Sequence, residues 1–182
     1  TYSLHQPARL AGIDLAYGAQ GLSWQVHEAG ESAALRTSLV GDYNASNLMG
    51  VLAALRALGV PLADAVSACD DLPQVPGRMQ RIDATGAPLV VVDYAHTPDA
   101  LAKALAALRP LADARGGRLW CVFGCGGNRD AAKRPLMAAA AQAAADRLIV
   151  TSDNPRDESP QAIIDQVLAG LTGHAAALVE PD

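Results

Sequence analysis

The chain has 182 residues, of which 51% are hydrophobic and 18% are charged, so it can form a packed core and is not a disordered chain. Its formal net charge of −5 offers no basic surface for nucleic acid. No run of about 18 apolar residues is present, so no transmembrane helix is expected. We predict a globular protein whose partners include neither nucleic acid nor a membrane.

The three cysteines form an odd, sparse set, which suits a reducing cytoplasm better than a disulfide framework. The sequence begins at Thr1 without a methionine and stops just after a predicted strand at residues 176–180. A doubly wound domain rarely ends on an uncovered strand. We therefore expect the chain to be a piece of a longer cytoplasmic protein.

Residues 1–40 predict short antiparallel strands joined by turns. Apolar residues alternate loosely with polar ones there, in segments such as 22–27 and 34–39, and glycines separate the segments. This part of the chain shows no strand–helix alternation.

A helix is predicted next, because apolar residues recur at helical spacing over residues 48–58 and Gly59 can end the helix. Pro61 begins a second, short helix that reaches about Asp70. The proline- and glycine-containing stretch that follows has the composition of a linker. We predict a domain boundary near Pro76.

Beyond that boundary, strands and helices alternate. The predicted strands are 89–93, 119–123, 147–151 and 176–180, and the helices between them begin near Thr97, Arg134 and Ser159. Strand 89–93 is a continuous apolar run, which is typical of a parallel strand buried on both faces. Strand–helix repeats with short connections form a parallel sheet with right-handed crossovers. The sequence thus predicts an α/β fold.

Three loops follow predicted strands and are rich in polar and charged residues: 93–99, 124–134 and 151–158. Ligands of parallel α/β sheets bind at the carboxyl ends of the strands. We therefore expect the functional site to be built from these three loops.

In the first loop, Asp93 at a strand end can accept hydrogen bonds from a ribose diol. His96, beside a helix N-terminus, can donate to a phosphate. The alternative is that Asp93 and Thr97 only cap the helix and that His96 is a surface residue.

The second loop contains glycines that let a ligand approach the backbone, and Arg129 can pair with a carboxylate. The third loop combines carboxylates, an amide and a cation, a set that suits a zwitterion with two carboxylates: Asp153, Asn154 and Arg156. The alternatives are a tight turn in the second loop and an Asx-turn in the third.

Several other site types are excluded. The second loop is not a Walker A motif, because no Gly-Lys-Ser/Thr follows it, and Arg129 replaces the third glycine of a dinucleotide fingerprint. Cys121 and Cys125 are four residues apart, and no histidines or cysteines cluster at metal spacing. We predict structural thiols and no metal site.

Five segments, taken in order, resemble the Mur ligases, which are ATP-dependent amino-acid ligases of peptidoglycan precursor synthesis. They are Gly41-Asp42-Tyr43-Asn44-Ala45-Ser46-Asn47, Gly77-Arg78-Met79-Gln80, the stretch from Val92 to Leu101, the stretch from Phe123 to Asp130, and Asp153-Asn154-Pro155-Arg156. The last is similar to the motif by which some family members recognise meso-diaminopimelate, whereas lysine-adding members usually lack its arginine.

The resemblance implies an ATP site. Asn44 and Asn47 match asparagines near the adenine end of ATP. Arg78 and Asp93 match residues near the ribose and the phosphates, and His96 matches a position that faces the phosphates.

The resemblance also implies that meso-diaminopimelate binds at Arg129, Asp153, Asn154, Pro155 and Arg156. The implied reaction forms an acyl phosphate on the glutamate side chain of UDP-N-acetylmuramoyl-L-alanyl-D-glutamate, which the amine of meso-diaminopimelate then attacks. A guanidinium fork suits the second carboxylate, which lysine lacks.

The implied domains are the end of a central ATP-binding domain at 1–76 and an incomplete, Rossmann-like C-terminal domain with a parallel sheet at 77–182. The family's P-loop, its carbamylated lysine and its magnesium-binding acidic residue have no match in this sequence. We therefore assign no catalytic residue, expect Mg²⁺ to be bound mainly outside this chain, and expect the chain alone to be inactive. Magnesium-dependent turnover by the isolated chain would contradict this expectation.

Three alternatives remain open. A folylpolyglutamate synthase or a lysine-adding ligase would share the fold, but residues 153–156 argue against both. A nucleotide-binding oxidoreductase is disfavoured by the broken fingerprint at Arg129. A non-catalytic binding module would be favoured if the longer protein did not turn over ATP.

Overall fold

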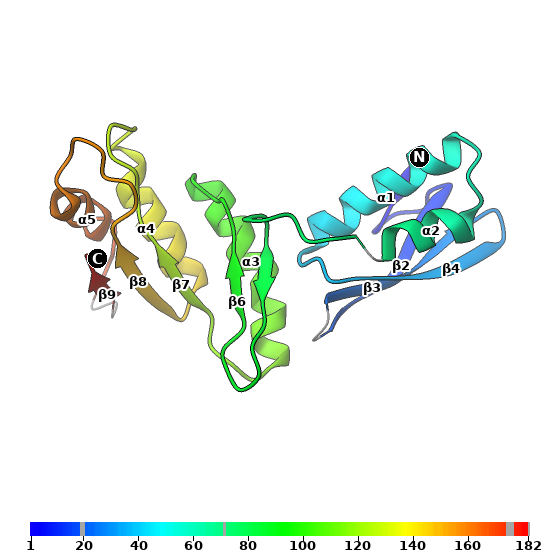
Figure 1. Ribbon diagram of the computed structural model, residues 1–182, viewed down its shortest axis with the longest axis horizontal. Coiled ribbons are helices and arrows are strands. Elements are labelled where there is room, and N and C mark those ends of the chain that lie inside the picture. The colour runs from blue at the N-terminus through cyan, green and yellow to red at the C-terminus, as the bar shows by residue number, and fades with distance from the viewer. Residues whose placement is uncertain (19–20, 71, 174–176, 182) are drawn as a thin grey trace. The chain divides into compact units, whose positions relative to one another are not determined.

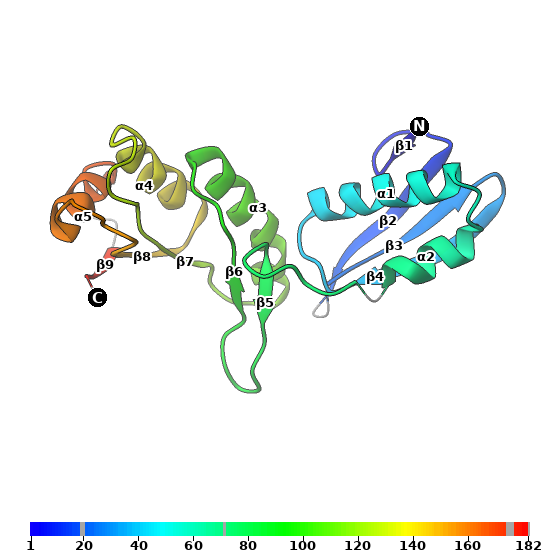
Figure 2. The same cartoon turned by 45° about the horizontal axis from the view of Figure 1, so that its top comes forward.

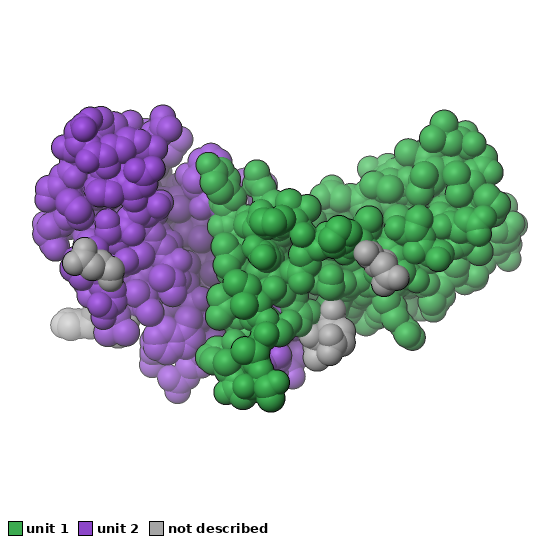
Figure 3. All heavy atoms as spheres, viewed as in Figure 1, with its two compact units in different colours: residues 1–94 green, residues 95–182 purple. Residues whose placement is uncertain are grey.

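A computed structural model describes residues 1–18, 21–70, 72–173 and 177–181 of the chain. The chain folds into two compact units, residues 1–94 and residues 95–182 (Figure 3). No helix within the described ranges is long and apolar enough to cross a membrane.

The larger part of the first unit is a four-stranded sheet with two helices packed on it (Figure 1). Its elements are β1 (Tyr2–Ser3), β2 (Leu10–Gly18), β3 (Gly21–Glu28), β4 (Glu31–Thr37), α1 (Asp42–Ala57) and α2 (Leu62–Asp70). The strand order is β1-β2-β3-β4, with β2, β3 and β4 antiparallel and β1 parallel to β2. The predicted antiparallel strands are confirmed for β2, β3 and β4, and both predicted helices are confirmed, whereas the parallel pairing of β1 with β2 was not predicted.

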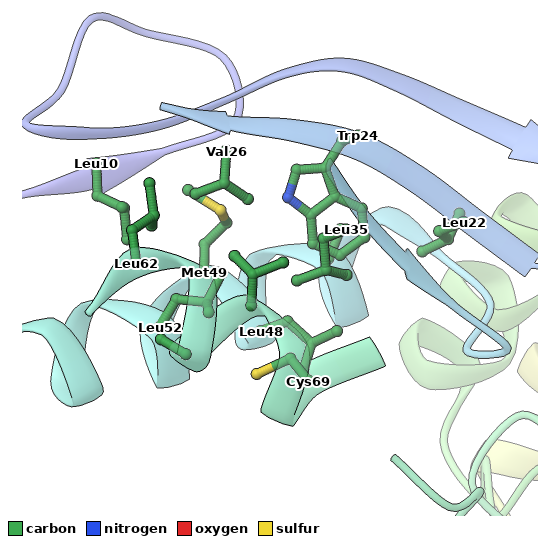
Figure 4. Packing of buried hydrophobic residues seen from close by; sticks show 13 residues of the cluster. Leu10, Leu22, Trp24, Val26, Leu35, Leu48, Met49, Leu52, Leu62 and Cys69 are labelled. Atoms are coloured by element: carbon green, nitrogen blue, oxygen red, sulfur yellow. The ribbon is translucent and has the colours of Figure 1, made fainter. Parts of the chain in front are cut away.

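Strand periodicity produces the core of this unit. Alternate residues of β3 are buried, so that Trp24 and Val26 point to the same side of the sheet. They meet Leu35 of β4 and the inward-facing Met49 and Leu52 of α1 (Figure 4). The apolar face of α1 therefore covers the apolar face of the sheet.

A buried carboxylate connects β3 to α1. The Glu28 side chain is only 3% exposed, and it accepts hydrogen bonds from Arg9 Nε at 2.9 Å and from Arg56 Nε. Arg56 also donates to the carbonyl oxygen of Val60 at 2.5 Å, just beyond the end of the helix. The hydrogen bond from Arg56 is the main cause that lowers the pKa of Glu28 below its ordinary value of 4.5.

We expect Glu28→Gln to destabilise the chain by about 2–3 kcal/mol at neutral pH, because a charged, buried acceptor is lost. A carboxyl group with a lowered pKa stabilises the fold above its unfolded-state pKa and loses this effect as the pH falls through its folded-state value. The difference in urea midpoint between wild type and variant should therefore shrink below pH 4.5. Glu31→Gln, at an exposed position of the same hairpin, is the control, and equal midpoints for all three proteins would contradict the prediction.

The last part of the first unit is a short hairpin of β5 (Gln80–Ile82) and β6 (Val90–Val92). The prediction that strand 89–93 is parallel and buried on both faces is wrong, because β6 pairs antiparallel with β5 and Val90 and Val92 are 49% and 42% exposed. Gly86, at φ 76°, lets the chain turn back on itself. The apolar run indicated a strand, but it could not indicate the direction of its partner.

The second unit contains a parallel sheet of strand order β7-β8-β9. Its elements are α3 (Pro98–Ala114), β7 (Trp120–Phe123), α4 (Lys133–Ala144), β8 (Arg147–Thr151), α5 (Pro160–Leu168) and β9 (Ala177–Glu180). Ala176, the first residue of the predicted last strand, lies outside the described residues. The predicted α/β class and the parallel sheet are confirmed, and Thr97 and Ser159 cap α3 and α5 as expected.

The three helices of this unit lie on one face of the sheet (Figure 2). On that face Cys121, Leu148 and Val150 are buried, whereas Trp120 and Val122 on the opposite face are exposed. The carboxyl ends of β7 and β8 lead directly into the two loops that the sequence singled out.

Candidate functional site at the ends of β7 and β8

The loops after β7 and β8 contact each other through their backbones. The amide nitrogen of Gly127 donates to the carbonyl oxygen of Asn154 at 3.1 Å. Arg156 Nη1 donates to the carbonyl oxygen of Gly127 at 2.6 Å. Neighbouring parallel strands end at the same edge of a sheet, and this geometry brings two of the three predicted loops together.

Glycine is required where these loops touch. A Cβ atom on Gly127 would lie 1.8 Å from the carbonyl oxygen of Pro155, and one on Gly124 would lie 2.5 Å from that of Thr151. Both distances are far inside van der Waals contact. The glycines therefore serve close approach between two backbones.

Several residues of the loops have left-handed backbone conformations. The φ angles are 52° at Asn128, 46° at Asn154 and 53° at Arg156. Asparagine tolerates this region, but it is uncommon for arginine, and such strain concentrates at functional sites. At Arg156 the conformation accompanies the hydrogen bond to Gly127.

The charged side chains predicted to bind a diamino acid are accessible. Arg129, Asp153, Asn154 and Arg156 are exposed, and Pro155 is half-buried. Three of these side chains could pair with opposite charges on a zwitterion, and Asn154 could donate or accept a hydrogen bond. The two loops thus expose cations and a carboxylate, and their backbones are in close contact at the glycines.

Sequence reasoning named Arg134 only as the approximate start of a predicted helix. The structure buries it to 2% exposure beneath the loops. Its Nη1 and Nη2 atoms each donate at 2.8 Å to the Glu158 carboxylate, and Nη2 also donates to the carbonyl oxygen of Gly126 at 3.2 Å. The pKa of Glu158 falls to about 2, chiefly because of the hydrogen bond from Arg134. The sequence could have predicted this burial, because helical spacing places Arg134 on the same face of α4 as the buried Met137, Ala138 and Ala141.

The nucleotide-site candidates of the first unit lie on two elements. Asn44 and Asn47 are on the first two turns of α1, where Asn44 Nδ2 donates to the carbonyl oxygen of Val40 at 2.7 Å. Asp93, directly after β6, accepts a hydrogen bond from the amide nitrogen of Met79 at 2.9 Å. The Arg78 guanidinium lies over a ring that the sequence had not singled out, 5.2 Å from the centroid of Tyr94.

Tyr43 lies in the segment 41–47 that carries the family resemblance, but sequence reasoning assigned it no role. Burial raises its pKa to about 12, and the charges of Asp93 and Asp42 contribute to the increase. Its hydroxyl therefore stays protonated near neutral pH and can donate a hydrogen bond. His96, from the same predicted loop as Asp93, belongs to the second unit, where it is exposed.

The cysteines are not activated as nucleophiles. Burial raises the pKa of Cys121 to about 11 and also raises that of Cys125, the latter against the opposing charge of Arg134. A raised pKa keeps a thiol in its unreactive form. Within the described part of the chain, no three His, Cys, Asp or Glu side chains form a group that could hold a metal ion.

Comparison with known proteins places the fold and the loops in one family. The family model "Mur ligase, glutamate ligase domain" matches residues 77–181. The match covers more than half of the chain, and the chain belongs to the Mur ligase family.

Relatives in several bacteria align with almost the whole length of this chain. The UDP-N-acetylmuramoyl-L-alanyl-D-glutamate–2,6-diaminopimelate ligase of Acidovorax sp. (strain JS42) is 58% identical over 180 residues, which are 99% of this chain and 36% of that protein. The enzyme of the same name from Chromobacterium violaceum is 50% identical over 182 residues. The chain spans just over a third of the length of these curated relatives.

Solved structures agree with this assignment. A UDP-N-acetylmuramoyl-L-alanyl-D-glutamate–2,6-diaminopimelate ligase matches with a TM-score of 0.72 and 39% identity, covering 100% of this chain and 37% of that one. A folylpolyglutamate synthase of Mycobacterium tuberculosis has the same TM-score at 21% identity, which shows a shared fold alone.

Proposed function

We propose that this chain is part of an ATP-dependent ligase that joins meso-diaminopimelate to UDP-N-acetylmuramoyl-L-alanyl-D-glutamate in peptidoglycan precursor synthesis. The observation that carries the proposal is the 58% identity, over 99% of the chain, to a relative with that activity in its name. The contact between the two charged loops supports it, because it holds Gly127, two residues before Arg129, against the segment 153–156.

In this proposal the loops of the second unit bind the incoming diamino acid. Arg156 and Arg129 pair with its carboxylates, and Asp153 pairs with an ammonium group. Asn154 supplies a further hydrogen bond, and Pro155 shapes the turn between them. Because lysine lacks the second carboxylate, it would leave a guanidinium without its partner, and a site of this kind discriminates strongly.

ATP is the other small-molecule substrate that this chain contacts in the proposal. Asn44 and Asn47 lie at the adenine end, Arg78 and Asp93 near the ribose and phosphates, and His96 towards the phosphates. The exposure of Asp93 and Arg78 and their common position beside β5 and β6 support this placement. Asp93 already accepts one hydrogen bond and has a second carboxylate oxygen for a ribose hydroxyl.

The proposed reaction has two steps. The glutamate side-chain carboxylate attacks the terminal phosphorus of ATP, which gives an acyl phosphate and ADP. The amine of meso-diaminopimelate then attacks the acyl carbon, phosphate leaves, and the amine proton passes to solvent or a base. In this proposal Mg²⁺ accompanies ATP and is bound mainly by residues outside this chain.

We propose domain limits of 1–76 for the end of the ATP-binding domain and 77–182 for the C-terminal domain. The start of the family match at residue 77 supports these limits. The proposed compartment is the bacterial cytoplasm, because the sequence has few cysteines and the relatives are bacterial. Roles in cell-wall biogenesis, cell shape and division would follow from the reaction.

The test uses the full-length protein, which is defined here as a protein that contains this chain and is as long as the curated relatives. Phosphate release is followed with ATP and UDP-N-acetylmuramoyl-L-alanyl-D-glutamate, and meso-diaminopimelate is compared with L-lysine. We expect turnover with meso-diaminopimelate alone. Equal turnover with lysine would mean that residues 153–156 form only a structural turn. No ATP turnover with either amino acid would favour a non-catalytic binding module.

A further inference from the structure

Arg134 contacts both loops of the proposed amino-acid site without being part of the accessible surface. Its guanidinium donates to Glu158 of the loop after β8 and to the carbonyl oxygen of Gly126 in the loop after β7. A third partner is Gln166 of α5, whose Oε1 atom accepts from Nη1 at 2.7 Å. One buried side chain therefore joins both loops to a helix.

Glu158 extends this connection back to the first loop. One oxygen of its carboxylate accepts from the amide nitrogen of Asn128 at 2.5 Å. The neighbouring Asp157 accepts from Asn128 Nδ2 at 2.8 Å. Asn128 directly precedes Arg129, so the hydrogen bonds from Arg134 through Glu158 end one residue away from a predicted substrate contact.

The ion pair between Arg134 and Glu158 is partly buried, with side-chain exposures of 2% and 32%. Replacing a buried ion pair by apolar groups is often neutral or stabilising, so the pair alone is weak evidence of a stabilising role. In addition, Arg134 Nε is buried without a hydrogen-bond partner among the described residues. The guanidinium is thus turned so that its two terminal nitrogens meet the loops, while one donor is left unsatisfied.

We propose that Arg134, acting through Glu158, is a positioning residue that sets the spacing between Arg129 and the segment 153–156, and thereby the selectivity for a diamino acid with two carboxylates. This inference rests on the proposed function. Arg134 does not touch the substrate, because it is 2% exposed. Its effect is exerted on the backbones that carry the accessible side chains, and small misplacements of such groups have large effects on rate.

The test measures KM and kcat of the full-length protein for meso-diaminopimelate and for ATP. Arg134→Lys keeps the charge but cannot bind both Glu158 oxygens and Gly126 in one plane. We expect its KM for meso-diaminopimelate to rise about tenfold, with the KM for ATP unchanged and the preference over lysine reduced. Arg109→Lys is the control, because Arg109 also binds carboxylates and a carbonyl oxygen, those of Asp146, Asp113 and Ala144, away from the loops.

Glu158→Gln is the second variant, in case Arg134→Lys does not fold. It should raise the same KM, and in a double variant the two effects should not add, because both changes break one connection. A purely structural role predicts instead a lower kcat, from fewer folded molecules, at unchanged KM.

Each outcome separates the hypotheses. Folded variants with an unchanged KM for meso-diaminopimelate, or with an equal rise for ATP, would overturn the positioning role while leaving the proposed function intact. A wild-type protein that is inactive with both amino acids would instead overturn the proposed function, and with it the selectivity assigned to Arg134.

Discussion

Arg156→Ala in the full-length protein is expected to lower kcat/KM for meso-diaminopimelate by about 100-fold, which is the typical effect of losing one partner of a buried or bound charge pair. The alanine leaves the distal carboxylate of the substrate without its bidentate partner. Any slow turnover with lysine should be unchanged, since lysine has no carboxylate to place there. The measurement is phosphate release at varied amino-acid concentration.

The control for this prediction is Arg147→Ala, because Arg147 is an exposed arginine at the opposite end of β8. Arg156 also donates a hydrogen bond to Gly127, so the urea midpoint of each variant should be measured alongside its activity. A loss of kcat/KM that is equal for both amino acids, or equal in the two variants, would show that Arg156 does not determine the selectivity for meso-diaminopimelate.

Gly127→Ala should disrupt the same site from the other loop. The added Cβ would lie 1.8 Å from the carbonyl oxygen and 2.6 Å from the carbonyl carbon of Pro155, and backbone atoms cannot move aside as a flexible side chain can. The loops must separate, which breaks the hydrogen bond from Gly127 to Asn154. We expect a loss of stability of about 1–3 kcal/mol, typical of overpacking, and loss of turnover with meso-diaminopimelate.

Urea unfolding of this chain and phosphate release by the full-length protein measure the two effects of Gly127→Ala. Gly117→Ala is the matched control, because its Cβ would meet its nearest neighbour, the carbonyl oxygen of Ala112, at an ordinary 3.7 Å. If Gly127→Ala behaves like Gly117→Ala, the two loops are not in backbone contact.

Local rules were sufficient to predict most of the elements. Thr97 and Ser159 cap their helices through bonds to residues three positions ahead, so the signal lies within one turn of the chain. The direction of β6 was missed because it depends on pairing with β5 across a turn, which an apolar run does not encode.

The accessible side chains of the candidate site could be predicted from the sequence, but the contacts that hold its two loops together could not. Residues such as Arg129 and Arg156 stand out because they are charged and follow apolar strands. The partners Arg134 and Glu158 are separated by 24 residues, and Gly127 meets Pro155 only once the strands are parallel and adjacent. Such contacts form only through tertiary packing, so they cannot be predicted from hydrophobic periodicity or from short sequence motifs.

The placement of the two tryptophans gives the chain one optical reporter in each unit. Trp24 is enclosed in the core of the first unit, where its fluorescence should be shifted to the blue, and Trp120 lies half-exposed on the open sheet face of the second, where emission should be redder. Replacing the exposed Trp120 by phenylalanine leaves Trp24 as the sole signal. The unfolding of the first unit and that of the second can therefore be followed separately, at two wavelengths, in a single unlabelled sample.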